Sequence, residues 1–438
     1  MRIYILLLIL LPAYSIAQLS KRITVDTKFN SIADDYVRLG LAIGEYDSDF
    51  VDAYYGPDLL KPTTIKQVTF PKDSFLNAVS NLQLRLQPYL TKTTEATLNN
   101  RAKWMSGQLT AFTCRIKMFS GEIISFDKQT KELFGVDVPV YNEDYLRSLL
   151  NQLNAVLPGQ GSINNRYQEL ANHFIIPKEK LDTLLKVTIA ESKKRTKQHF
   201  ILPANEDFKL EYVTDKPWSG YNWYQGNYKS RIQFNTDVTS YVDRIIDIAS
   251  HEGYPGHHVY NSGLEKELYH DKGWVEVSLY PLFCPQSLIA EGSANYGVEM
   301  AFPGDERMNF AKNHLLNLAG IDTTGLYIYF NALAIKGKLQ NARMEVARRV
   351  TDGKMTEPEA TRWLMEYALY NEKDAVRYIS FIKKYQAYVI NYTYGMDLVQ
   401  HYIEGYGEVK NNMQQRWKLF QWLLTNEVMP SDLMESKK

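Results

Sequence analysis

The sequence predicts a mainly α-helical fold of the α+β class, with one small antiparallel β-sheet near the middle of the chain. Three observations lead to this prediction. Apolar residues recur at helical spacing through most of the chain before position 200. Short β-like runs then occupy positions 208–235. From Val238 onward the helical pattern returns and continues almost to the C-terminus. With 438 residues, 45% of them hydrophobic, the chain is long enough to bury a large core.

The first 17 residues have the pattern of an export signal. Met1 and Arg2 form a short positive region, an apolar run covers positions 3–13, and positions 15–17 end in a small residue of the kind that signal peptidases cleave after. We expect cleavage after Ala17 and a mature protein that is periplasmic or secreted. No cysteine follows the run, which argues against a lipid anchor. The run is also shorter than the ~20 residues of a spanning helix, although an uncleaved anchor is the alternative. We expect no membrane segment in the mature chain.

Helices are expected in order through the N-terminal half. Positions 31–43 and 73–121 carry helical patterns, the second with a break near Pro88, and positions 142–156 follow the capping residue Asn142. The Pro- and Gly-containing segment 157–162 is the best linker candidate. The sequence therefore predicts an N-terminal helical region at 18–157 and a second region at 158–438, or one continuous domain over 18–438.

The predicted sheet lies between helices. Helical patterns at 162–174 and 177–199 precede two strand candidates, Lys209–Val213 and Arg231–Phe234, with turns at 218–220 and 225–227. Further along, positions 356–359 form a capping box that begins a helix. A long aromatic-rich helical region is expected at 372–402, and a last helix at 408–424. The sheet should directly precede the helix that begins after Val238.

Composition limits the partners. The 50 basic and 50 acidic residues give a formal net charge of zero, so nothing points to nucleic acid. The 31 tyrosines favour broad aromatic surfaces. Cys114 and Cys284 either pair or stay as two buried free thiols, and the sequence leaves both options and the oligomeric state open.

Three of the 8 histidines gather in one stretch, which reads His251-Glu252-Gly253-Tyr254-Pro255-Gly256-His257-His258. In the H-E-x-x-H motif two histidines four residues apart share a zinc ion, and the glutamate is the general base. Here Pro255 stands where the second histidine should be. On a straight helix His257 would point roughly 120° away from His251, and His258 would lie about 10.5 Å along the axis. The helix must therefore be distorted, which Pro255-Gly256 favours. We prefer His257 as the second ligand and leave His258 as the alternative.

A carboxylate from a following helix should complete the site. Glu291 follows small residues, and Gly292 and Ala294 would let two helices approach closely. Two histidines and one glutamate, with a fourth position for water, form the open type of catalytic zinc site. The sequence thus predicts Zn²⁺ held by His251, His257 and Glu291, with Glu252 as general base; the native metal stays open.

The histidine stretch followed by Glu291-Gly292 resembles the signature of the domain-of-unknown-function 885 family. Positions 51–57, 377–378, 386–387 and 394–395 resemble that family more weakly. The resemblance implies an exported bacterial protein with a zincin-like, largely helical metallopeptidase fold, with the same three ligands and the same base. Two positions depart from the family pattern: Ser293 stands in place of a common Trp, and Val298, followed by Glu299, in place of a second carboxylate.

The expected reaction is hydrolysis of a peptide or small amide bond, in which Glu252 moves the proton. The candidates for donating a hydrogen bond to the oxyanion are Tyr394, Tyr385 and His258. Arg377 is a candidate for holding a substrate carboxylate, which would favour carboxypeptidase-like action, and Asn235 ends a strand that could pair with an extended substrate. The alternatives are a non-catalytic secreted protein that binds peptide or glycan around a structural metal, a metal-free scaffold, and a hydrolase of cell-wall amides. Exo- and endo-cleavage cannot be separated from sequence.

Overall fold

The computed structural model describes residues 26–63, 66–91, 95–216, 218–405 and 409–434. The expected signal segment, 1–17, lies outside them. Within the described residues the protein is mainly helical with small sheets, as predicted. The helices are α1 (Thr27–Gly44), α2 (Lys72–Thr91), α3 (Ala96–Phe119), α4 (Phe126–Phe134), α5 (Glu143–Val156), α6 (Ile163–Asn172), α7 (Leu181–Lys197), α8 (Val242–Ile248), α9 (His257–Leu264), α10 (Pro285–Ala301), α11 (Glu306–Phe310), α12 (Asn317–Ala319), α13 (Leu326–Leu339), α14 (Ala342–Thr351), α15 (Glu357–Tyr367), α16 (Glu372–Tyr385), α17 (Ile390–Glu404), α18 (Met413–Leu424) and α19 (Pro430–Met434).

Several predicted helix starts are confirmed by their caps. The Asn142 side chain accepts a hydrogen bond from the Tyr145 amide at the start of α5, and the capping box of Thr356 and Glu359 begins α15. Other boundaries differ. Pro88 lies inside α2, and α3 begins only at Ala96. The long region predicted at 372–402 is divided between α16 and α17, since Gln386 adopts a positive φ of 47°.

The three-stranded sheet consists of β2 (Asp207–Val213), β3 (Gly220–Gly226) and β4 (Lys229–Asn235) in the order β2-β4-β3. The expectation of a purely antiparallel sheet is corrected here, because β2 and β4 pair in parallel whereas β3 and β4 pair antiparallel. Asn227 and Tyr228 both have positive φ and form the tight turn that joins β3 to β4. Because β3 thereby takes one edge of β4, β2 is left with the other edge, where it runs in the same direction as β4.

A second, two-stranded sheet pairs β1 (Val51–Tyr54) with β5 (Leu279–Pro281) antiparallel. The sequence predicted neither of these two strands. The partners are more than 220 positions apart (279 − 54 = 225), so no local pattern could reveal the pairing. This small sheet brings the segment around Asp52 against the central helices.

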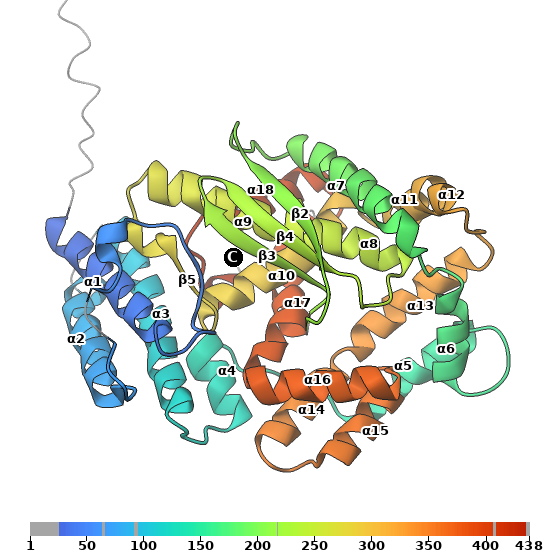
Figure 1. Ribbon diagram of the computed structural model, residues 1–438, viewed down its shortest axis with the longest axis horizontal. Coiled ribbons are helices and arrows are strands. Elements are labelled where there is room, and N and C mark those ends of the chain that lie inside the picture. The colour runs from blue at the N-terminus through green and yellow to red at the C-terminus, as the bar shows by residue number, and fades with distance from the viewer. Residues whose placement is uncertain (1–25, 64–65, 92–94, 217, 406–408, 435–438) are drawn as a thin grey trace, which may run out of the picture.

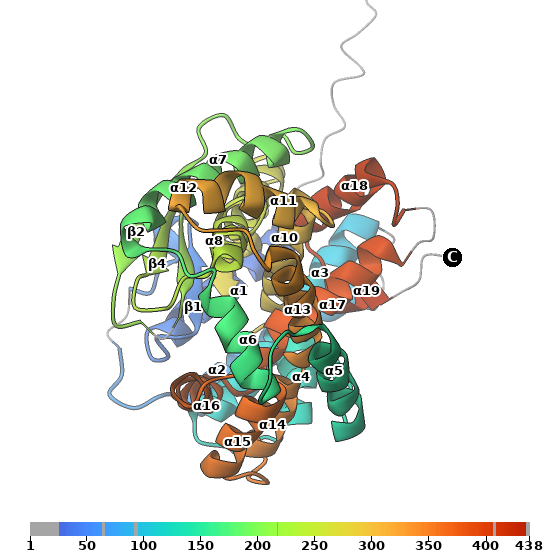
Figure 2. The same ribbon diagram turned by 90° about the vertical axis from the view of Figure 1, so that its right-hand side faces the viewer.

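The sheet, α8 and α10 form successive layers. Figure 1 shows the three-stranded sheet lying over α8 and α9, with α10 beneath and α17 running from α10 toward α16. The turned view agrees, with the sheet on one side, α18 and α19 on the other, and α10 and α17 between them (Figure 2). Side chains from α5, α6, α7, α8 and α13 share one apolar cluster, so residues on both sides of segment 157–162 pack together. A second cluster surrounds α10 and α17, and a third joins α1, α2 and α3.

Candidate metal centre

The helix that carries the histidine stretch is interrupted where the sequence predicted. After Ile248, α8 continues as a π-helical turn, Ala249–Gly253, which carries His251 and Glu252. The chain then leaves helical geometry at residues 254–256, and α9 begins at His257. A π-turn inserts an extra residue into a helix, and together with the break it absorbs the two additional residues of the spaced motif.

Gly256 allows the return toward His251. Its amide donates a 3.0 Å hydrogen bond to the carbonyl oxygen of Ser250. A Cβ atom at position 256 would lie 2.5 Å from that oxygen and 2.5 Å from the His251 carbonyl carbon, and nearer still to the His251 carbonyl oxygen. Because backbone atoms cannot rotate aside, only glycine permits this contact. The local sequence therefore sets the distance between the two imidazoles.

The carboxylate comes from α10. Glu291 lies in the middle of this helix, and the neighbouring Gly292 packs directly against α17, where a Cβ would lie 2.5 Å from the carbonyl carbon of Gly395. The close approach expected at Gly292 is thus present. It holds α17 tightly against the helix that carries Glu291.

Three donor atoms come together at this point. The Nε2 atoms of His251 and His257 are 3.1 Å apart, and Glu291 Oε2 lies 3.3 Å from the first and 3.6 Å from the second. Tetrahedral zinc with bonds of about 2.0–2.1 Å places its donor atoms about 3.3 Å from one another. Glu291 Oε2 is buried and accepts no hydrogen bond from the described residues. The three residues therefore form a group that could hold a metal ion.

Electrostatics keep the donors ready for a cation. Burial acts to raise the pKa of Glu291, but His257 and His251 hold that pKa well below its usual range. Burial acts to lower the pKa of His257, yet the carboxylates of Glu291, Glu252 and Asp52 together raise it to about 9. Such a histidine gives up its proton when a metal binds. The group therefore has the charge balance of a cation site.

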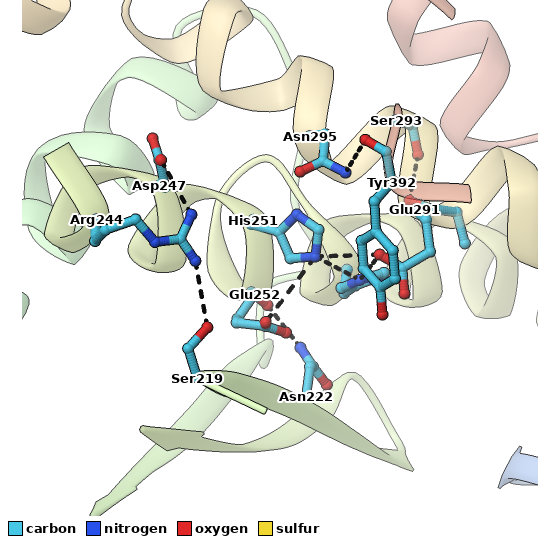
Figure 3. A network of polar contacts seen from close by, with 12 residues as sticks. Ser219, Asn222, Arg244, Asp247, His251, Glu252, Glu291, Ser293, Asn295 and Tyr392 are labelled. Carbon is cyan, nitrogen blue, oxygen red and sulfur yellow. Dashed lines mark hydrogen bonds and ion pairs between the residues drawn. The ribbon is translucent and has the colours of Figure 1, made fainter. Parts of the chain in front are cut away.

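Glu252 lies beside the donors and against the sheet. Its Oε1 is 4.0 Å from His251 Nε2. Figure 3 shows Glu252 between His251 and the strand that carries Asn222, whose amide donates to the Glu252 carbonyl oxygen at 2.7 Å. A Cβ at Gly220 would lie 3.1 Å from Glu252 Oε1, so this glycine leaves room for the carboxylate. Burial raises the pKa of Glu252, which strengthens it as a base.

A further side chain near the centre, that of Asp52, was not predicted. Asp52, on β1, accepts a hydrogen bond from the Tyr221 hydroxyl, and burial raises the pKa of Asp52 to about 6. The pKa of Asp52 also responds to the charges of His257 and Glu291, which places it near them. No sequence signal pointed to its role, because β1 reaches the centre only through its pairing with β5.

Tyrosines of the segment 388–392 face the donors. The Tyr388 hydroxyl donates a 2.9 Å hydrogen bond to Glu291 Oε1. Tyr392 lies beside Glu291 (Figure 3), and burial raises its pKa, with further contributions from Glu291 and Glu252. The four-residue spacing of Tyr388 and Tyr392 is a signal that sequence reasoning missed. Tyr394 was one of the candidates instead, but two residues on a helix turn the side chain by about 200°, so Tyr394 points elsewhere.

The structure does not bring His258 to the donor group. Its ring is fully buried, with Nδ1 2.8 Å from Ser230 Oγ and Nε2 3.0 Å from Glu206 Oε2. A carboxylate only accepts hydrogen bonds, so Nε2 donates to Glu206 and Nδ1 of a neutral ring accepts from Ser230. The expectation of a ligand or catalytic group at His258 is corrected to a residue that ties α9 to β4.

Three other expected residues also lie apart from the donors. Tyr394 is half-buried, and the charges that raise its pKa, after burial, are those of Asp137 and Asp397. Arg377 is exposed and pairs with Asp374 at 3.0 Å, one helical turn away. Asn235 is buried and its amide donates to the carbonyl oxygens of residues 216 and 218. These three residues stabilise local structure instead. The sequence could not reveal this, because the type of a polar residue does not show which way its side chain points.

Tyr385, another oxyanion candidate, packs among aromatic rings, with its ring centroid 4.7 Å from that of Phe381.

Cys114 and Cys284 are both buried free thiols, so they do not form a disulfide bond with each other.

Comparison with known proteins places the fold. No protein-family model matches the sequence, and no curated protein matches it. A solved structure of a provisionally assigned lipoprotein from Colwellia psychrerythraea aligns with a TM-score of 0.54 and 15% identity, covering 82% of this chain and 65% of that one. This chain therefore spans about two thirds of the length of that protein. At such low identity the likeness shows a shared fold.

Weaker structural likenesses accompany it. An M32 carboxypeptidase from Deinococcus radiodurans R1 aligns with a TM-score of 0.46 and 10% identity, covering 93% of this chain and 95% of that one. A provisionally assigned lipoprotein of unknown function from Shewanella oneidensis aligns with a TM-score of 0.42 and 12% identity, covering 81% and 73%. Over the described ranges, no helix combines the length and apolar character needed to cross a membrane.

Proposed function

We propose that this protein is an exported, zinc-dependent hydrolase of peptide or small amide bonds, with His251, His257 and Glu291 as metal ligands and Glu252 as general base. The spacing of the three donor atoms, 3.1–3.6 Å, carries the proposal because it matches a tetrahedral zinc site. Membership of the domain-of-unknown-function 885 family is part of the same proposal and rests on the histidine stretch with Glu291-Gly292.

The donor set suits zinc in its open, catalytic form. Two imidazoles and one carboxylate leave a fourth position, and hydrolytic sites use that position for water. Tyr388 supports the assignment, because its hydrogen bond to Glu291 Oε1 fixes the carboxylate while Oε2 stays free for the ion. A bound zinc ion supplies Lewis acidity that polarises the scissile carbonyl and makes water a nucleophile near neutral pH.

The chain's own residues perform the proton transfers. Glu252 accepts the proton of the attacking water and passes it to the nitrogen of the departing amine. Its raised pKa helps it to hold that proton between the two steps. The Tyr392 hydroxyl, whose pKa burial raises so that it stays protonated, would donate a hydrogen bond to the negative oxygen that develops on the carbonyl carbon. Glu252 and Glu291 are both buried, which limits the access of bulk water to these two carboxylates.

Replacement of the base tests the proposal. Glu252→Gln should bind as much zinc as the parent protein, since residue 252 is not a ligand, but should lose turnover by about 10²- to 10⁴-fold. Zinc is measured by elemental analysis, and turnover by mass spectrometry of a mixed peptide pool. Glu366→Gln, an exposed side chain on α15, is the matched control. Full turnover by a zinc-loaded Glu252→Gln variant would refute the assignment of the base. Zinc binding without cleavage by the parent protein would favour the non-catalytic alternative.

A further inference from the structure

Two partly buried cations in the C-terminal half of the chain lack acidic partners among the described residues. Lys336 on α13 and Arg343 on α14 form no ion pair with any residue that the structure describes. Instead, Lys336 Nζ lies 3.3 Å from the Tyr167 hydroxyl and 4.4 Å from its ring centroid. Arg343 donates a long, 3.5 Å hydrogen bond to the Tyr370 hydroxyl, and its guanidinium lies 5.3 Å from the Tyr378 ring centroid. Removing cations from water without a counter-charge is costly, so such an arrangement calls for a reason.

Other buried arginines of this protein satisfy their guanidinium groups more fully. Arg101 makes a bidentate pair with Glu276. Arg166 has no acidic partner, but it donates three hydrogen bonds of 2.8–2.9 Å to Asn154 and Leu157. Arg343 has no acidic partner and only longer bonds, 3.3 Å to the Gln340 carbonyl oxygen and 3.5 Å to the Tyr370 hydroxyl.

The nearest carboxylates are already engaged. The Lys336 pKa responds to Asp243 and Asp374, but Asp243 accepts a 2.6 Å hydrogen bond from Tyr329, and Asp374 pairs with Arg377. Burial outweighs their attraction and lowers the pKa of Lys336 to about 8. Arg343 also lowers the pKa of Lys336, so an anion bound between the two cations would reverse this shift.

Aromatic contacts link Arg343 to the metal centre. Tyr378 stacks on Phe381 at 5.7 Å, and Phe381 lies 6.2 Å from Tyr392. The Tyr378 hydroxyl is buried and has no hydrogen-bond partner among the described residues. The Tyr392 hydroxyl contributes to the raised pKa of Arg343, so the guanidinium lies within electrostatic range of a side chain that itself lies beside Glu291 (Figure 3).

We propose that Lys336 and Arg343 form a subsite for a carboxylate of the substrate, next to the bond that is cleaved. This inference rests on the proposed hydrolase function and adds the substrate class: acyl compounds or peptides that carry a carboxylate close to the scissile bond. The carboxylate has two sources, a free C-terminus or an acidic side chain. Arg343 offers the bidentate fork that carboxylates prefer, and Lys336 adds a compact second charge. The subsite replaces Arg377, which the structure pairs with Asp374.

Equilibrium binding tests the subsite without any need for turnover. The zinc-loaded, full-length Glu252→Gln protein is titrated calorimetrically with three probes. N-benzoylglycyl-phenylalanine carries a free C-terminal carboxylate, and N-benzoylglycyl-phenylalanine amide is its neutral counterpart. N-benzoylglycyl-glutamate amide carries a carboxylate only on its side chain. At least one acid should bind about 10- to 100-fold more tightly than the neutral amide, the range expected for charged hydrogen bonds. The preferred acid identifies the source, a C-terminus or a side chain.

Substitutions then assign the preference to the two residues. In the same background, Arg343→Met combined with Lys336→Met should abolish the preference for the acid, whereas Arg343→Lys should keep part of it. Arg349→Ala is the matched control, because Arg349 lies on the same helix and stacks on Trp363 at 4.5 Å. Circular dichroism checks that each variant is folded.

Equal binding of acid and amide, an absence of measurable binding by all three probes, or a preference that survives the double substitution would overturn the subsite. Failure of the hydrolase proposal would appear separately, as a lack of cleavage by the parent protein in the peptide pool.

Discussion

Adding one methyl group at Gly256 should dismantle the metal centre while leaving most of the fold intact. A Cβ there would lie 2.5 Å from two backbone atoms of residues 250 and 251, and real contacts of this kind stay beyond 3.0 Å. The chain must therefore move by at least about 0.5 Å (3.0 − 2.5), and by more to clear the His251 carbonyl oxygen. Metal–ligand distances tolerate only about ±0.2 Å. His251 and His257 could then no longer share one ion with Glu291.

The expected result of Gly256→Ala is a loss of zinc affinity of at least about 10- to 100-fold, the range seen when even outer-shell partners of a metal are removed. Affinity is measured by competition with a chromogenic chelator, and secondary structure by far-ultraviolet circular dichroism. Gly337→Ala is the matched control, because a Cβ at this position on α13 meets nothing within 4 Å. A Gly256→Ala protein that binds zinc as tightly as its parent would refute the role given to this glycine.

Three further outcomes are expected. Glu206, held by His258, Lys193 and Tyr254, has its pKa lowered to about 2 in the folded protein despite burial. Because this value lies below the ordinary 4.5, the stabilisation is complete above pH 4.5 and is lost as the pH falls toward 2. Glu206→Gln should therefore remove about 2–3 kcal/mol at pH 7 and little at pH 2, measured by urea unfolding at both values; equal losses at both would contradict it. Tyr388→Phe should weaken zinc binding by about 10-fold, since Glu291 loses its orienting hydrogen bond; unchanged chelator competition would count against that role. Cys114 and Cys284, whose pKa values burial raises to about 12, should react with a thiol reagent only after unfolding, and rapid labelling of the native protein would disprove their burial.

Much of the fold could be predicted because its signals are local. Helical periodicity, the Asn142 cap and the Thr356 capping box act within a few residues of the chain, so they specify α5 and α15 without reference to anything distant. Strands β2 and β4 were recognised in the same way. Their pairing was not, because no local pattern records that β2 lies beside β4 rather than beside β3.

The candidate site divides along the same line. The proline and glycine at 255–256 predicted a broken helix, and the structure places His257 rather than His258 beside His251. Side-chain direction decides the roles that were misplaced. Tyr392 faces Glu291 and Tyr394 does not, although they are only two residues apart, because helical rotation sends them to different sides.

The sequence by itself determined the residue types, the helix that carries them and the need for a break between the two histidines, because each of these follows from bonds and steric contacts between near neighbours. Only the tertiary structure decided which side chains surround the three donor atoms. Asp52 and Tyr388 reach this region from separate elements, and their approach depends on helix packing at Gly292 and on the pairing of β1 with β5. Contacts of this kind join positions far apart in the chain, and no local pattern records them.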